Sequence, residues 1–463
     1  MKRAAILSAA LVCVASSAFA EAAETVPQVS DVVMTQDKST REVTISYKLS
    51  GGTSAVVTLD VQTNAEADVW ASIGGENISC LEGAVNRIVT AADAADGVYT
   101  IKWHPDRSWN GHRVTDGGAR AVVKAWALDD KPDYLVVSLV PDAIVRKAYY
   151  PSAEFLPGGL LTNPDYRTNK VVLRRIHAKN VPWTMGTICE YGRDPNDGRE
   201  TTRQIVLTND YYLAVFETTQ AQWALVYGDN ASNANFKVEG EMRPMERVSY
   251  CEIRENSVYN SASKPNRYPG APHAGSYLGK LRTRTGVDFD LPGEAQWEFA
   301  ARAGHGEGYW GDGSPLLRST TDANLAKLGR VKFNGGLIGG KDEPSASVGP
   351  TNGTAIVGSY LPNSWGLYDM HGNVWEWVLD WQVKDNGTLA QLGGTINGNI
   401  NKDTYPIMGT VNVQKTVAYR IVRGGCYSSA SIQSTRAGYR SGDGWIWRQI
   451  TTGFRLACGD GLK

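Results

Sequence analysis

The stretch with the densest set of chemistry-bearing side chains is WGLYDMHGNVWEWVLDW, residues 365–381. Asp369, His371, Asn373 and Glu376 are interspersed there with tryptophans and glycines. Neither an amphipathic helix nor an alternating strand has this pattern, which is typical of a tightly coiled loop. Carboxylate and amide oxygens are ligands that hard cations such as Ca²⁺ prefer. The stretch therefore predicts a packed loop that a hard cation could stabilise.

Other residues with catalytic potential form no recognised motif. The sequence has no C-x-x-C pair, and no Cys/His cluster has zinc spacing. The six histidines show no i,i+4 spacing on a predicted helix, so local spacing does not indicate an iron site. There is no G-x-S-x-G, no phosphate-binding loop and no carboxylate pair with a spacing diagnostic of acid–base catalysis. Motifs of this kind therefore indicate no reaction.

The elements that must position these residues follow a secretory signal. Lys2 and Arg3 precede an apolar run from Ala4 to Val14, and Ala18-Phe19-Ala20 forms an A-x-A cleavage site. We predict a signal peptide over residues 1–20 and a periplasmic, extracellular or cell-surface protein. Because the apolar run is too short to cross a bilayer, we expect no membrane span.

Bulk composition narrows the function classes. The chain has 47 basic and 48 acidic residues, a net charge of −1. It therefore has no basic surplus for nucleic acid or for an anionic membrane surface. The 49 glycines and 14 tryptophans are typical of a loop-rich or all-β extracellular fold. The length remaining after cleavage is enough for two or three domains.

Residues 21–141 predict a small β-sandwich of immunoglobulin or fibronectin type. Apolar and polar residues alternate in four runs, 43–49, 57–61, 99–103 and 123–127. Such runs place one face of each strand on a core, and turn signals such as Gly51-Gly52 and Asp96-Gly97 separate them. We interpret the module as a spacer or docking domain, with partner binding as the alternative. A turn-rich connector follows over residues 142–169.

Residues 170–463 predict a second domain that mixes strands and helices. Strands are expected over Lys170–Ile176, Tyr419–Arg423 and Gly453–Ala457. Thr218 or Thr219 can cap a helix that contains Trp223 and Val226.

The second predicted helix of this domain has the stronger boundary signals. Pro292 stands at its first position, Glu294 lies in its first turn and Gly304 follows its end. Trp297 shares one face of this helix with Ala300.

Several motifs of the second domain occur in an order that resembles a known family. They are FETTQAQW, PMERVSY, LPGEAQWEFAARAG, WGLYDMHGNVWEW, RIVRGGCY and GFRLA. The region from Lys170 to the C-terminus is similar to the formylglycine-generating enzyme, or sulfatase-modifying factor, family. The resemblance implies an α+β fold of C-type-lectin type with much irregular backbone. The β module and the connector lie outside it.

The resemblance also implies where catalysis would occur. Oxidase members of the family convert a sulfatase cysteine to formylglycine with copper and O₂. Their two copper-binding cysteines match Ser429 and Ser434 here, and the serine of the family's Gly-Gly-Ser matches Cys426. Since thiolates suit Cu(I) and hydroxyls do not, we expect no copper site. Iron-dependent relatives use histidines on a separate helical bundle that this sequence lacks, so we expect no iron either.

Calcium is the cofactor that the resemblance implies. The family's calcium loop matches Asp369, Gly372, Val374 and Glu376, which offer two carboxylates and two backbone carbonyls. The alternative is that the two carboxylates accept hydrogen bonds from loop amides. A second family site begins at positions that match Asn324 and the Leu325 carbonyl, without a clear acidic partner.

The sequence leaves the pairing of the cysteines open. Cleavage leaves Cys80, Cys189, Cys251, Cys426 and Cys458, an odd number, so at least one thiol has no partner in the chain. Export permits disulfides. We expect a structural Cys426–Cys458 bridge between neighbouring strands, with a reactive Cys426 thiol as the alternative, and Cys189 could pair with Cys251.

The last segment carries the residues expected to face a ligand. Arg436, Arg440, Trp445 and Trp447 are side-chain types that anchor binding surfaces. We therefore interpret the chain as an exported, calcium-stabilised binding protein for a peptide, protein or glycan. The alternative is a metal-dependent oxidoreductase of the same family that acts on a protein cysteine or a small thiol.

Overall fold

The computed structural model describes residues 26–460 with internal gaps. The gaps are 67–68, 115–116, 144, 188–199, 201, 229–233, 238–239, 256–270, 318, 320, 336–352, 383, 386–387 and 390–418. The predicted signal peptide and Cys189 lie outside the described residues.

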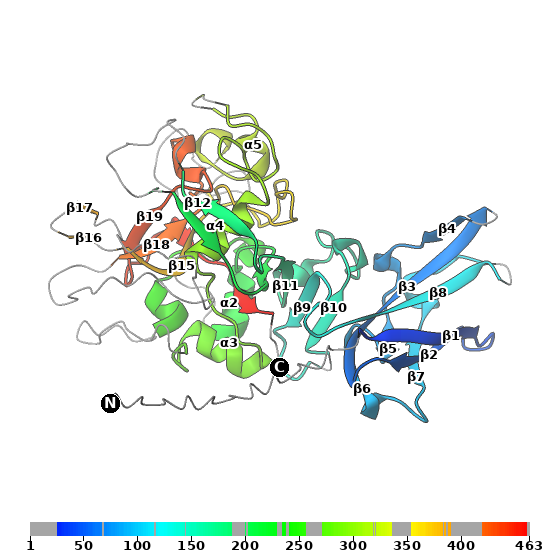
Figure 1. Ribbon diagram of the computed structural model, residues 1–463. Helices are drawn as coiled ribbons and strands as arrows, with labels where there is room; N and C mark the ends of the chain where they lie inside the picture. The colour runs from blue at the N-terminus through cyan, green and yellow to red at the C-terminus, as the bar shows by residue number, and fades with distance from the viewer. Residues whose placement is uncertain are drawn as a thin grey trace, which may run out of the picture.

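An N-terminal module of antiparallel sheets forms one end of the molecule (Figure 1). One sheet has the order β1-β2-β7-β5, with bounds Gln28–Gln36, Val43–Ser50, Tyr99–Trp103 and Leu81–Gly83. The other contains β4 (Val69–Ser72), β3 (Ser54–Glu66), β6 (Arg87–Thr90) and β8 (Ala119–Trp126), with β8 paired to β3. Ile45 and Ile101 of the first sheet pack with Val57 and Leu59 of the second, as the alternating pattern predicts. The immunoglobulin or fibronectin subtype stays a prediction.

A five-stranded sheet joins this module to the second domain (Figure 1). Its order is β10 (Lys147–Tyr150), β9 (Tyr134–Ser138), β11 (Lys170–Ile176), β14 (Tyr211–Ala214) and β21 (Ala457–Gly459). The predicted strand over Lys170–Ile176 is confirmed. Strand β9 lies in the range predicted for the module and β10 in the predicted connector, yet both belong to this sheet. The second domain's sheet therefore begins before residue 142.

A second sheet and three helices complete the domain. The sheet has the order β19 (Ser441–Gly444), β18 (Tyr419–Arg423), β15 (Trp375–Gln382) and β20 (Thr452–Gly453). Helices α2 (Gln220–Tyr227), α3 (Tyr277–Thr285) and α4 (Glu294–Arg302) pack beside the sheets, and β12 (Pro182–Met185) pairs with β13 (Arg203–Val206). The short elements are α1 (Pro105–Ser108), α5 (Leu325–Leu328), β16 (Lys384–Asp385) and β17 (Thr388–Leu389). The predicted α+β class is confirmed.

Local sequence signals account for both predicted helices. Thr219 is the N-cap of α2, where its hydroxyl accepts a hydrogen bond from the Gln222 amide at 3.2 Å. Helix α4 starts at Glu294 and its last turn is followed by Ala303 and Gly304, both with positive φ. The predicted helix start at Pro292 is two residues too early, because Gly293 is the N-cap.

The C-terminal strand prediction needs a larger correction. Tyr419–Arg423 forms β18 as predicted, but Gly453–Ala457 is not one strand. Gly453 ends β20, which runs parallel to β15, whereas Ala457 begins β21 in the five-stranded sheet. The chain between them crosses from one sheet to the other, and Arg455 lies in that crossing.

Among the described residues, no helix is both long enough and apolar enough to cross a membrane.

The Thr219 cap provides a test of the fold. Its hydroxyl also donates to the Arg167 carbonyl at 2.8 Å, so Thr219→Ala removes two hydrogen bonds at a buried helix start. We expect a loss of about 1–2 kcal/mol in the free energy of unfolding, measured by urea titration. Thr219→Ser keeps both bonds and should recover most of that stability. Equal stability of the alanine and serine variants would contradict the capping role.

Candidate functional site

The tryptophan-rich loop, residues 365–374, is tightly coiled, as the composition predicts. The prediction of a loop as far as Trp381 is wrong for the second half of the stretch, because Trp375–Gln382 pairs with its neighbours as strand β15. Asp369 and Asn373 have φ values of 58° and 61°, and Gly372 has a φ of 127°. A Cβ on Gly372 would lie 2.5 Å from the Arg330 carbonyl oxygen, so only glycine fits there without a shift. The loop ends where β15 begins at Trp375.

Glu376 forms the central ion pair of this region. Its two carboxylate oxygens accept from Arg455, at 2.7 Å from Nε and 2.6 Å from Nη2. The Trp297 indole N–H donates to the same carboxylate at 2.7 Å. All three side chains are buried. The structure therefore gives Glu376 a guanidinium partner that the sequence prediction did not include.

Glu217 is a site residue that the sequence interpretation missed. It is fully buried, and its carboxylate accepts from the Asn373 amide at 2.5 Å and from the Val374 backbone N–H at 3.1 Å. Burial, followed by the nearby charges of Asp369 and Glu376, raises the pKa of Glu217 well above its usual value. Its position after the apolar residues 214–216 was the available signal, because an acidic residue that follows directly on a buried apolar run needs a partner.

Asp369 is the residue of this loop that fits a cation. One carboxylate oxygen accepts from the Gly358 amide at 2.7 Å, while Oδ1 is buried without a hydrogen-bond partner. Burial raises the pKa of Asp369 to about 6. A bound cation would satisfy Oδ1, whereas the oxygens of Glu376 already have donors. Calcium would thus be held through Asp369 and loop carbonyls, with Glu376 available only if it left Arg455.

The described residues contain no cluster of three or more His, Cys, Asp or Glu side chains that could hold a metal. The predicted calcium set has two carboxylates, so it is not tested by that finding. At the second predicted site, Asn324 and Leu325 donate their amides to Asp322 Oδ1 at 2.8 and 3.1 Å. Asp322 thus anchors the start of α5, and calcium at this site stays a prediction.

His371 has a hydrogen-bond partner at each ring nitrogen. Its Nδ1 lies 2.9 Å from the Thr435 carbonyl and its Nε2 accepts from the Gly311 amide at 3.1 Å. Burial lowers the pKa of His371 to about 4. The neutral ring therefore bridges two chain segments at neutral pH.

The positions that match the family's copper cysteines make local hydrogen bonds. Ser429 Oγ accepts from the Cys426 amide at 3.0 Å, and Ser434 Oγ donates to the Ser431 carbonyl at 2.9 Å. Cys426 is buried against Phe236, and burial raises the pKa of its thiol. A protonated, buried thiol is a poor nucleophile.

The predicted Cys426–Cys458 disulfide is wrong. Both thiols are free, as is that of Cys80. Cys458 lies in β21 of the five-stranded sheet, while Cys426 follows β18 of the other sheet. The prediction assumed that these strands are neighbours, and the crossing of the chain between sheets separates them. The Cys189–Cys251 pairing lies outside the described residues because of Cys189.

The predicted ligand surface is largely internal. Arg436 is buried in an ion pair with Glu200 at 2.9 Å, and Arg440 pairs with the buried Glu294 through Nε at 2.6 Å. Trp445 packs partly buried against the main core. Acidic residues distant in sequence draw both arginines inward, so neither presents a free guanidinium on a surface. Trp447 remains exposed at 43%.

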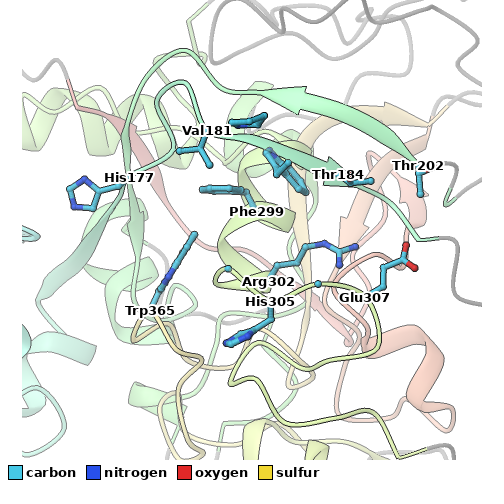
Figure 2. A pocket seen from close by; sticks show the side chains of 13 residues that line it. His177, Val181, Thr184, Thr202, Phe299, Arg302, His305, Glu307 and Trp365 are labelled. Carbon is cyan, nitrogen blue, oxygen red and sulfur yellow. The ribbon is translucent and has the colours of Figure 1, made fainter.

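A cavity of about 630 Å³ lies elsewhere, between the β12–β13 hairpin and α4 (Figure 2). Trp183 of β12, Phe299 of α4 and Trp365 of the tryptophan-rich loop form a continuous aromatic wall. The Phe299 ring centroid is 5.3 Å from that of Trp183 and 5.2 Å from that of Trp365. Cavities of this size and lining are typical of ligand sites.

Polar groups complete the cavity. Arg302 is held by Glu298 at 2.7 Å and by the Gly186 carbonyl at 2.6 Å, and His305 contacts Ser364 at 2.9 Å. Figure 2 shows Phe299 and Arg302 extending from α4 toward the hairpin. The sequence interpretation did not group these residues, because they come from four separate segments.

The buried carboxylate of Glu246, which bonds the backbone of Phe236, gives a test of the electrostatics inside this domain. Glu246 Oε1 accepts from the Phe236 amide at 3.0 Å, while Oε2 is buried without a partner. Burial raises its pKa from 4.5 to about 7. Because the folded state holds this proton more tightly, its contribution to stability is present below pH 4.5 and lost as pH rises through 7.

We therefore expect Glu246→Gln to flatten the pH dependence of unfolding. Relative to this variant, the wild type should lose about 3 kcal/mol between pH 4 and 7.5, measured by urea titration. The exposed Glu241→Gln is the matched control and should leave the curve unchanged. Parallel curves for wild type and Glu246→Gln would contradict the assignment.

The similarity to a known protein family lies in the second domain. The family model described as "Sulfatase-modifying factor enzyme 1-like domain" matches residues 182–459. The chain is 33% identical over 222 residues to "Chaperone protein LppX" of Paenibacillus barcinonensis, which covers 43% of this chain and 75% of that protein. It is 37% identical over 99 residues to the formylglycine-generating enzyme of Thermomonospora curvata, 20% of this chain and 28% of that enzyme.

Two solved structures align with this chain at low identity. Treponema denticola variable protein 1 has a TM-score of 0.41 and 21% identity over 63% of this chain and 95% of its own. PvdO from Pseudomonas aeruginosa has a TM-score of 0.41 and 20% identity over 62% and 94%. The family match spans more than half of the 463 residues, and the LppX match spans three quarters of that protein. The chain therefore belongs to the family of the sulfatase-modifying factor enzyme 1-like domain.

Proposed function

We propose that this chain is an exported binding protein whose sulfatase-modifying-factor-like domain holds a segment of polypeptide. The observation that carries the proposal is the cavity lined by Trp183, Phe299 and Trp365. Three aromatic side chains from separate segments provide a large apolar contact area with little conformational freedom to lose. Arg302 and His305 add polar groups at the rim.

A polypeptide suits this cavity better than a glycan. The rings meet at interplanar angles of 52° and 60°, so they enclose an apolar side chain rather than offer one flat platform for a sugar ring. The alignment with the relative named as a chaperone covers three quarters of that relative's length. A chaperone binds polypeptide, which supports the same ligand class here.

The absence of the copper ligands supports binding over oxidation. Ser429 and Ser434 replace thiols with hydroxyls, and Cys426 is buried with a raised pKa. The predicted signal peptide supports export to the periplasm, the cell surface or the medium. Copper or iron copurifying in stoichiometric amount, together with O₂ consumption on a cysteine-containing peptide, would replace this proposal with an oxidoreductase.

The pocket assignment is tested with the mature chain and an unfolded probe, reduced and carboxymethylated α-lactalbumin. We expect wild type to bind the probe and Trp183→Ala/Trp365→Ala to weaken binding at least tenfold, measured by biolayer interferometry. Trp447→Ala removes an exposed tryptophan outside the cavity and should leave binding unchanged. Failure of wild type to bind the probe, or loss of binding only in Trp447→Ala, would overturn the proposal.

We further propose that calcium stabilises the loop through Asp369. EDTA should lower the melting temperature of the mature chain and excess Ca²⁺ should restore it. Asp369→Ala should abolish that difference, because it removes the unpartnered Oδ1. Asp312→Ala, which removes a carboxylate bonded to Ser314 outside this loop, should keep it. An EDTA effect of unchanged size in Asp369→Ala would exclude this ligand.

A further inference from the structure

Strand β12 has one paired edge among the described residues. It pairs antiparallel with β13 in a two-stranded sheet, with Trp183 opposite Ile205, Thr184 opposite Gln204 and Met185 opposite Arg203. The other edge faces α4 and the cavity (Figure 2). Four consecutive residues, 181–184, line the cavity. Side chains on a strand alternate between faces, so a cavity lined by successive residues meets the strand along its edge.

The hydrogen bonds of Gly186 show which backbone groups point to that edge. Its N–H donates to Glu298 Oε1 of α4 at 2.8 Å. The peptide bond is planar and trans, so the Met185 carbonyl points the opposite way, toward β13. Residues of an antiparallel pair alternate between those that bond across the pair and those that point away. Met185 therefore bonds to β13, and the N–H and C=O of Thr184 point away from it.

Helix α4 already occupies the end of this edge. Glu298 accepts the Gly186 N–H, and Arg302 donates to the Gly186 carbonyl at 2.6 Å. Two residues earlier, the outward N–H and C=O of Thr184 lie on the same edge, and Thr184 is exposed and lines the cavity. Its hydroxyl accepts from Gln204 on the β13 side at 2.7 Å, so the side chain does not cover the edge. Pro182, which lacks an N–H, presents only its carbonyl.

We propose that the ligand polypeptide binds as a third strand on the β12 edge. Its backbone pairs with the N–H and C=O of Thr184 and with the Pro182 carbonyl. One of its apolar side chains enters the wall formed by Trp183, Phe299 and Trp365. The inference rests on the proposed function and specifies its binding mode. Strand addition takes affinity from main-chain hydrogen bonds and selectivity from a pocket for alternate side chains.

Hydrogen-bond complementarity indicates which class of ligand binds the β12 edge. An unpaired strand edge presents donors and acceptors at the spacing of another extended backbone. A glycan or a folded helical partner has no matching row of N–H and C=O groups. The aromatic wall adjoins the edge at Trp183, so one extended chain can satisfy both. This mode accepts many sequences, as binding of unfolded chains requires.

The experiment removes one edge N–H without touching the aromatic wall. Thr184→Pro deletes the outward N–H, which β13 does not use, and proline is tolerated at an outward-facing position of an edge strand. Thr184→Val keeps the N–H and is the matched control. With reduced, carboxymethylated α-lactalbumin as probe, we expect Thr184→Pro to lose at least tenfold in affinity and Thr184→Val to stay within twofold of wild type.

Hydrogen exchange of wild type gives a readout that does not depend on how the proline variant folds. The Thr184 amide should exchange at least tenfold more slowly with the probe bound than without it. The amides of Trp183 and Met185, which face β13, should change little. One combination of results would show that strand addition is wrong while the binding function stands. In it, the tryptophan variant loses binding, Thr184→Pro binds normally, and the Thr184 amide of wild type stays unprotected when the probe is bound. If wild type does not bind the probe at all, both fail.

Discussion

The buried ion pair between Glu376 and Arg455 is the interaction on which the second domain depends. Glu376 lies at the start of β15 and Arg455 in the crossing between the two sheets, and the Trp297 indole of α4 donates to the same carboxylate. Arg455 also donates to the backbone carbonyls of Ala214 and Tyr368. Two charges removed from water cost several kcal/mol unless every polar atom is bonded. Here the bonds tie a helix, both sheets and the tryptophan-rich loop to one point.

The charges around this pair are unequal. Glu217, Asp369 and Glu376 are buried around the guanidinium of Arg455, and Arg330 adds a second positive charge near Asp369. Ionisation of all three carboxyls would leave an excess of negative charge, which a low-dielectric interior strongly disfavours. Burial, and after it the neighbouring negative charges, raises the pKa values of Glu217 and Asp369. Protonation of one carboxyl and a cation at Asp369 are two ways to relieve this excess, and both leave the Glu376–Arg455 pair intact.

Sequence reasoning succeeded where the signal was local. The Thr219 cap, the Lys170–Ile176 strand and the coiled tryptophan-rich loop depend on residues close together in the chain. It failed where partners are distant. Arg436 looked like a surface anchor because Glu200, 236 positions away, could not be paired with it from the sequence. The Cys426–Cys458 disulfide failed for the same reason, since the sheet to which each strand belongs is a tertiary property.

Helix α4 explains why the cavity could not be predicted and why it is well defined. Three consecutive residues of α4 make contacts in three different directions. Trp297 points to the core pair, Glu298 holds Gly186 and Arg302, and Phe299 joins the aromatic wall. A helix turns about 100° per residue, so one rigid element presents all three directions. Because Trp297 is anchored to Glu376, the position of Phe299 is set by the core and not by a flexible loop. Glu298 fixes the end of the β12 edge to the same helix through its hydrogen bond to Gly186. The proposed binding edge is therefore ordered in the free protein, and this order lowers the entropy lost when a ligand strand binds.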